Sequence, residues 1–146
     1  MTARDIYITD KDMDRLRELL RTTKDPDGRE RPYLESLRVE LDRARIVPPE
    51  SIDAGVVTMN SKVRVRDVAA PRGRTIITLV YPERADLETN HVSVLAPLGA
   101  AMLGCRAGER VSFDVPSGVR TCEVEEVLYQ PEAAGDVHLE VNRFRQ

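Results

Sequence analysis

The spacing of apolar residues predicts two helices within the first 47 positions. The apolar residues of the first stretch recur at three- and four-residue steps: Met13, Leu16, Leu19 and Leu20. The second stretch repeats this spacing: Leu34, Leu37, Leu41 and Ala44. Such spacing places side chains along one face of a helix. Thr9, three residues before Asp12, is typical of the residue that caps a first turn, and Pro32 suits the first turn of the second helix.

The polar segment "TTKDPDGRERP" separates these two stretches. Pro26 and Gly28 favour a turn there, so we expect the two helices to form a short antiparallel hairpin. Each helix has about 14 residues, which makes this coiled coil roughly 20 Å long. "VPPES" at residues 47–51 ends the helical pattern, because proline lacks the amide hydrogen and clashes with the preceding turn. The pattern predicts a helical hairpin over residues 1–47 and a second domain over residues 52–146.

Beyond residue 51 the hydrophobic pattern alternates with a period of two, which is typical of β-strands. Strands are expected in five segments: "KVRVRDV", "RTIITLVYP", "HVSVLA", "ERVSFDVP" and "GVRTCEVEEVLY". The alternation of the last segment shifts at Glu125–Glu126, which indicates a β-bulge. In "APLGAAMLG", Pro97 suits a first helical turn and Gly104 the left-handed residue after the last one. The predicted fold class is therefore α+β, with one short helix packed on a mostly antiparallel sheet.

Composition narrows the classes of function. The chain has 146 residues, and its 22 basic and 25 acidic side chains leave a net charge of −3, unlike a basic nucleic-acid-binding arm. No segment approaches the ~20 apolar residues of a membrane span, and the N-terminus has no apolar run typical of a secretory signal. Cys105 and Cys122 lie in separate segments, as in proteins with reduced thiols. We expect a cytoplasmic protein with no metal site and no cofactor.

Two groups of charged residues are candidates for function. The first group alternates with valines and forms a basic row on one face of a predicted strand: Lys62, Arg64 and Arg66. This row is interpreted either as a solvated sheet face or as an electrostatic contact with an acidic protein surface or nucleic acid. The second group lies in the turn between the helices: Asp25, Asp27 and Glu30. Carboxylates are the ligands that magnesium prefers, but Lys24, Arg29 and Arg31 in the same turn would neutralise them.

The order of motifs in the second half resembles the C-terminal domain of the GreA/GreB transcription elongation factors. A strand is followed by the "APLGAAMLG" helix, an "AGERV" turn, a strand, a "PSG" turn and a final strand. Other segments are similar to one branch of that family, the Rnk-type regulators of nucleoside diphosphate kinase: "DAGVVTMNSKVRVRD", "TLVYP", "LYQPEAAGD" and "ELDRARIVPPE". The resemblance covers nearly the whole chain.

This resemblance implies an FKBP-like domain that binds the rim of the RNA polymerase secondary channel. In Gre factors the loop before the short helix meets a polymerase coiled coil, and here it consists of four residues: Leu95, Ala96, Pro97 and Leu98. Leu95 and Leu98 would supply apolar anchors beside a rigid proline. The alternative is that one of these leucines, Leu98 above all, packs inward under the helix. The long Gre coiled coil also reaches down the channel and helps hold a catalytic magnesium ion with acidic residues at its tip.

The resemblance leaves two hypotheses about function. In the first, the chain is a polymerase-binding protein and not an enzyme, it competes with Gre factors, and it meets nucleic acid only through the polymerase complex. In the second, it is a Gre-like cleavage factor that acts through Asp25, Asp27 and Glu30. Hairpin length favours the first, because an arm of roughly 20 Å is too short to span the channel. Any effect on a kinase would be indirect, since the chain has no phosphate-binding glycine loop.

Overall fold

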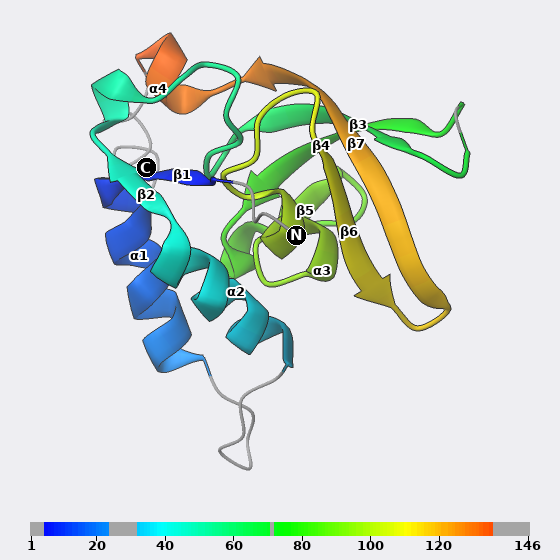
Figure 1. The fold of residues 1–146 in the computed structure, drawn as a ribbon, viewed down its shortest axis with the longest axis horizontal. Coiled ribbons are helices and arrows are strands. Elements are labelled where there is room, and N and C mark those ends of the chain that lie inside the picture. Colours follow the sequence, from blue (N-terminus) through cyan, green and yellow to red (C-terminus); the bar gives the residue numbers. More distant parts are fainter. Residues whose placement is uncertain (1–4, 24–31, 71, 136–146) are drawn as a thin grey trace.

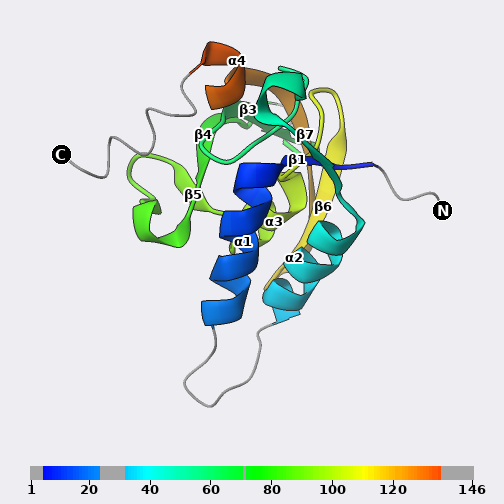
Figure 2. The same cartoon turned by 90° about the vertical axis from the view of Figure 1, so that its left-hand side faces the viewer.

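The computed structural model describes residues 5–23, 32–70 and 72–135. A five-stranded sheet with the strand order β5-β4-β3-β7-β6 forms its centre. The strands have these bounds: β3 Lys62–Asp67, β4 Arg74–Val80, β5 His91–Ser93, β6 Arg110–Val115 and β7 Gly118–Tyr129. Figures 1 and 2 show three helices gathered against one side of the curled sheet: α1 (Asp10–Thr22), α2 (Pro32–Arg43) and α3 (Pro97–Met102). The predicted α+β class is confirmed.

Helix α1 begins at the predicted residue. The Thr9 hydroxyl accepts a hydrogen bond from the Asp12 backbone N–H at 3.1 Å, which satisfies a donor that the first helical turn leaves without a backbone partner. Most of the apolar positions that define the predicted stripes point inward. The buried members of the two predicted stripes are Met13, Leu16 and Leu20 in α1 and Leu34, Leu37 and Leu41 in α2. Burial of this face, rather than helix propensity, holds such short helices together.

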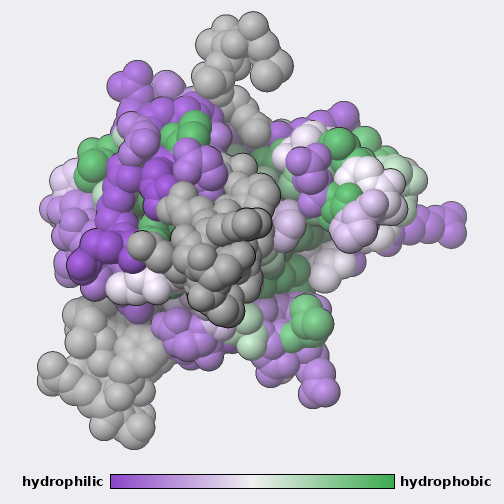
Figure 3. Space-filling model, turned by 90° about the horizontal axis from the view of Figure 1, so that it is seen from below, coloured by the Kyte–Doolittle hydropathy of each residue, from purple (hydrophilic) through white to green (hydrophobic). Residues whose placement is uncertain are grey.

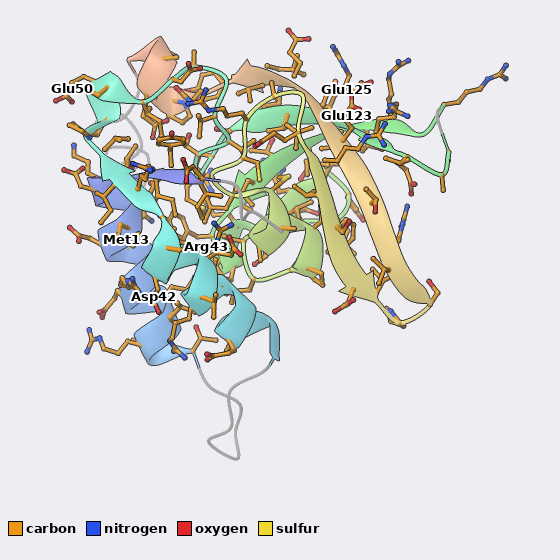
Figure 4. All side chains as sticks on the ribbon, in the orientation of Figure 1. Met13, Asp42, Arg43, Glu50, Glu123 and Glu125 are labelled. Atoms are coloured by element: carbon orange, nitrogen blue, oxygen red, sulfur yellow. The ribbon has the colours of Figure 1, made fainter. Side chains whose placement is uncertain are left out.

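Helices α1 and α2 lie side by side, as Figure 2 shows. An ion pair between Arg17 and Asp42 joins them at 2.8 Å, and Figure 4 labels Asp42 where the two helices adjoin. The 13 residues of α1 correspond to a length of about 20 Å. The turn that carries Asp25, Asp27 and Glu30 lies outside the described residues.

A two-stranded parallel sheet was not predicted. It pairs β1 (Tyr7–Thr9) with β2 (Arg45–Val47), and Tyr7 lies opposite Arg45. The sequence pattern predicted only helices within residues 1–47 and missed these two strands, because three-residue strands are too short for a period of two to show. The pair brings the segment before α1 next to the segment after α2. Short helical turns complete the described chain: η1 (Pro49–Ser51), η2 (Pro82–Arg84) and α4 (Pro131–Ala134).

The five-stranded sheet is mixed rather than purely antiparallel. β3 runs antiparallel to both of its neighbours, β4 and β7, and β6 runs antiparallel to β7. β5 runs parallel to β4, with Thr78 opposite His91. The expected antiparallel sheet is therefore corrected at this edge, because the chain between the two strands turns through η2 and returns in the original direction.

Two local predictions about the sheet domain are confirmed. Arg64 lies opposite Glu126 while the next residue, Val65, lies opposite Val124. Glu125 is thus the extra residue of a β-bulge at the predicted position. Gly104 has a φ of 78°, the left-handed conformation expected after the last turn of α3, where an added side chain would be strained.

The buried side chains form one core that draws on both halves of the chain. The helices contribute Ile8, Leu16, Leu37 and Leu41, and the sheet contributes Val63, Leu79, Val111 and Val124. Met102 and Leu103, at the end of α3, belong to the same cluster. The position of α3 is therefore fixed from two sides, by the sheet and by the N-terminal helices.

Candidate functional site

The 95–98 loop is held by hydrogen bonds to Ser93 at the end of β5. Ser93 organises the loop: its hydroxyl accepts a hydrogen bond from the Leu95 N–H and its carbonyl one from the Ala96 N–H, both at 3.0 Å. Ala96 has an extended conformation and Pro97 is the first residue of α3. Proline suits this position, because it has no N–H to leave unsatisfied and its φ is already helical.

Gly99 allows α3 to approach the preceding strand closely. A Cβ atom at this position would overlap the carbonyl oxygen of Ser93, and it would also lie 3.1 Å from the Cα of Val94. At its other end, α3 is tied to the rest of the molecule by Gly104, whose N–H donates to the Val57 carbonyl at 2.9 Å. The loop is consequently presented on a rigid base rather than on a free connection.

The four loop residues differ in how far their side chains are exposed to solvent. Pro97 is exposed, whereas Leu95, Ala96 and Leu98 are half-buried. Leu95 and Leu98 both pack against the hydrophobic core while keeping part of their surface accessible. Figure 1 places α3 between α2 and β6. The loop thus offers one exposed rigid ring flanked by partly accessible leucine side chains.

The basic row on β3 lies beside acidic residues of β7. The sequence pattern alone did not connect these two groups. We call the sheet surface opposite the helices the outer face, and Lys62, Arg64 and Arg66 lie on it. Arg64 lies 2.5 Å from Glu126, and Arg66 lies 3.2 Å from Glu123. Figure 4 labels Glu123 on β7 beside β3. The structure therefore brings two members of the basic row into a network of ion pairs.

Glu125, the bulge residue, is the centre of this network. Its carboxylate lies 3.4 Å from Arg64, 3.5 Å from Arg66 and 3.0 Å from Arg74, and its side chain is only 15% exposed. The bulge directs it to the same face as Glu123 and Glu126. The glutamates of "CEVEEV" were visible in the sequence, but the pairing of β3 with β7, which places them opposite the arginines, was not.

Three ionisable groups of β3 and β7 have displaced pKa values. A hydrogen bond from Arg120 lowers the pKa of Asp67, and the Asp67 carboxylate in turn raises the pKa of Arg120. Burial raises the pKa of the Cys122 thiol, with a smaller contribution from Asp67. Cys122 therefore remains a neutral thiol at physiological pH, which makes it a poor nucleophile.

Exposed apolar residues do not form one dominant patch on the described surface. The exposed large side chains are spread over α2, β2, β4, β7 and the loop before β5: Val39, Ile46, Ile76, Leu87, Val119 and Leu128. Seen from below in Figure 3, green areas are divided by purple ones wherever grey atoms leave the surface visible.

Within residues 5–23, 32–70 and 72–135, no three His, Cys, Asp or Glu side chains are placed to hold a metal ion. None of the helices in these ranges is long and apolar enough to cross a membrane.

Comparison with known proteins identifies the class to which this fold belongs. Residues 52–129 match the family described as "Transcription elongation factor, GreA/GreB, C-term". Residues 4–47 match the "Rnk N-terminus" family. The chain therefore belongs to the GreA/GreB family of transcription factors, in the branch that carries an Rnk-type N-terminus.

Individual relatives agree with this assignment. The chain is 42% identical over 137 residues to a regulator of nucleoside diphosphate kinase from Escherichia coli K12, covering 93% of this chain and 98% of the relative. It is 34% identical over 94 residues to the transcription elongation factor GreA of Syntrophobacter fumaroxidans, covering 64% of this chain and 60% of that protein. A solved GreA/GreB structure from Nitrosomonas europaea superposes with a TM-score of 0.71 at 38% identity, covering 87% of this chain and all of that one. These relatives are named as transcription factors or regulators.

Proposed function

We propose that this protein is a transcription regulator that binds RNA polymerase at the secondary channel and competes there with Gre factors. It acts by occupying the site and is not itself an enzyme. In this proposal, residues 52–146 form an FKBP-like docking domain in the cytoplasm, and residues 1–47 form a short helical hairpin that points into the channel.

The geometry of the 95–98 loop supports this proposal most directly. Its sequence resembles the Gre docking loop, and its exposed Pro97 stands on a helix fixed by the close approach of Gly99 to Ser93. Rigid apolar residues at an interface lose little conformational freedom on binding and often carry much of the binding energy. Membership of the GreA/GreB family supports polymerase as the partner.

The basic row has a smaller part in the proposed contact. Arg64 and Arg66 are engaged with Glu123, Glu125 and Glu126 on the same face. An acidic partner surface would have to compete with these glutamates, and replacing one ion pair by another brings little net gain in free energy. We assign the docking energy mainly to the loop, with Lys62, Arg64 and Arg66 as an electrostatic supplement.

The length of the helices supports occupancy without cleavage. α1 and α2 have 13 and 12 residues, which makes each about 20 Å long. Magnesium coordination requires carboxylate oxygens at about 2.0–2.1 Å from the ion. Carboxylates at the end of so short an arm remain well above the polymerase active centre, so we expect no stimulation of RNA cleavage.

The deciding experiment is a competition assay with purified RNA polymerase. Immobilised polymerase is incubated with the full chain, and a Gre factor is then titrated in. We expect the chain to bind and to be displaced by the Gre factor. Absence of binding, or binding that the Gre factor leaves unchanged, would refute the proposed function.

A further inference from the structure

The two backbone N–H groups just before Pro97 both donate to one residue, Ser93. The Leu95 N–H donates to the Ser93 hydroxyl and the Ala96 N–H to the Ser93 carbonyl, each at 3.0 Å. The segment from Ser93 to Ala96 is therefore a β-turn with serine at its first position. A serine hydroxyl that accepts from the N–H two residues onward is a recognised way of stabilising such a turn.

Helix α3 begins without a capping side chain of its own. Ala96 occupies the cap position, and its methyl group cannot accept a hydrogen bond from the first helical turn. Pro97 follows as the first helical residue and has no N–H to donate. α3 has only six residues, and so short a helix depends on contacts outside itself. The bonds to Ser93 are the polar contacts that fix how the chain enters it.

We infer that Ser93 is a positioning residue for polymerase docking: its hydroxyl holds the turn so that Pro97 already has its binding orientation in the free protein. This inference rests on the proposed function and specifies what prepares its docking loop. A segment that is ordered beforehand does not have to be ordered at the moment of binding. Without the hydroxyl, fewer molecules would have a competent loop, and the apparent affinity would fall by the same fraction.

Packing of the neighbouring leucines is the competing explanation for the order of this loop. Leu95 and Leu98 both pack against the core, and they fix the loop at two points. Pro97 lies between these points, and the direction of its ring follows the two preceding peptide planes. Those planes contain the Leu95 and Ala96 N–H groups, and both groups donate to Ser93. The hydrogen bonds therefore determine what the packing leaves open.

The hydroxyl of Ser93 can be removed without disturbing the backbone around it. The contacts that join β5 to α3 are made by the Ser93 carbonyl, which accepts from Ala96 and lies where a Cβ atom of Gly99 would be. These contacts remain when the side chain changes. Ser93 is also half-buried, so water does not freely replace the hydroxyl as the acceptor for the Leu95 N–H. Ser93→Ala should consequently fold normally and change the turn alone.

Binding kinetics distinguish a positioning residue from one that touches the partner. If the hydroxyl sets the population of competent loops, its removal lowers the association rate constant and leaves the dissociation rate constant unchanged. The loss of a direct contact acts mostly on dissociation. Pro97→Arg should therefore raise the dissociation rate constant, whereas Ser93→Ala should lower the association rate constant.

The test measures association and dissociation of the full chain on immobilised RNA polymerase. Ser93→Ala is expected to associate about three- to tenfold more slowly than the wild type, the factor that corresponds to one neutral hydrogen bond. Ser112→Ala removes an exposed serine hydroxyl from β6 and should bind as the wild type does. Ser93→Thr and Ser93→Val have nearly the same shape, and only the threonine keeps the hydroxyl. Ser93→Thr should associate about three- to tenfold faster than Ser93→Val.

Amide hydrogen exchange in the free chain gives a readout that does not need polymerase. The Leu95 N–H should exchange at least about threefold faster in Ser93→Ala than in the wild type, because it loses its acceptor. Wild-type association and wild-type Leu95 exchange in Ser93→Ala would overturn the inference. So would a change confined to the dissociation rate constant, or equal association of Ser93→Thr and Ser93→Val.

The same experiment separates this inference from the proposed function. In each of the outcomes just described the wild type still binds polymerase, so the proposed function stands while the role of Ser93 fails. A wild type that does not bind polymerase overturns the proposed function, and the docking role of Ser93 with it.

Discussion

The carboxylate of Asp12 accepts a hydrogen bond from the backbone N–H of Met59, a residue 47 positions further along the chain, at 3.2 Å. Asp12 lies in the first turn of α1, and Met59 lies in the segment that leads into β3. Both residues are buried. The bond ties the helical region to the sheet at a point where water cannot replace it.

Asp12→Ala is expected to destabilise the protein by about 1–3 kcal/mol, because it leaves the buried Met59 N–H without this acceptor. Urea unfolding followed by circular dichroism measures the change. Asp14→Ala, an exposed site on the same helix, should change the free energy of unfolding by no more than about 0.5 kcal/mol. Equal effects of the two variants would show that the bond contributes little.

Pro97→Arg is expected to weaken polymerase binding by ~2 kcal/mol or more, roughly thirtyfold in Kd, without loss of fold. The exposed position of Pro97 makes it the cleaner probe of the loop. Leu95→Asp should weaken binding as well, but Leu95 also packs against the core, so its unfolding transition is measured alongside. Ala85→Arg, at an exposed neutral site outside the loop, is the matched control for one added surface cation. Wild-type affinity for both loop variants, with intact folding, would refute the assignment of the loop.

Replacement of Asp25, Asp27 and Glu30 together by Ala should leave polymerase binding within about tenfold (~1.4 kcal/mol) of wild type. Neither the wild type nor the triple variant should shorten the transcript in a stalled elongation complex. In the proposed docking position, helices of about 20 Å would leave these carboxylates more than a Debye length of ~8 Å from the polymerase active centre. Transcript shortening by the wild type that the triple variant abolishes would support the Gre-like cleavage hypothesis instead.

Cys122 should react slowly with iodoacetamide in the native protein and rapidly in urea, because burial raises its thiol pKa. The measurement uses a Cys105→Ser background, so that one thiol is followed. By linkage, the folded state holds this proton more tightly than the unfolded state. Stability is thus unaffected below the unfolded thiol pKa of about 8.5 and falls as pH rises above it. Native labelling as fast as in urea would contradict the assigned burial.

Features encoded within a few neighbouring residues were predictable from the sequence. Thr9 caps α1, Gly104 adopts the left-handed conformation, and Glu125 forms the bulge. Val63 and Val65 are buried as their alternation indicates. In each case the signal is a residue type at a fixed position relative to a local pattern, so no knowledge of distant partners was required.

Features that depend on distant pairing were not predictable from one sequence. The parallel pairing of β1 with β2 joins segments almost 40 residues apart, as Tyr7 opposite Arg45 shows. Likewise, the glutamates of β7 became partners of Arg64 and Arg66 only once the register of β3 with β7 was known. For the loop, the residue types indicated an anchor, but the division into an exposed Pro97 and a half-buried Leu95 follows from how α3 packs.

The single core shared by the N-terminal helices and the sheet also determines how the molecule opens. Leu16 and Leu37 are packed in the same cluster as Val63 and Leu79, so the helices cannot separate without exposing the apolar side of the sheet to water. Proteins open in roughly contiguous cooperative units, and we expect the residues of this shared cluster to open as one of them. Amide hydrogens of α1 should therefore exchange with solvent in the same global event as those of β3, rather than through an earlier, independent detachment of the arm.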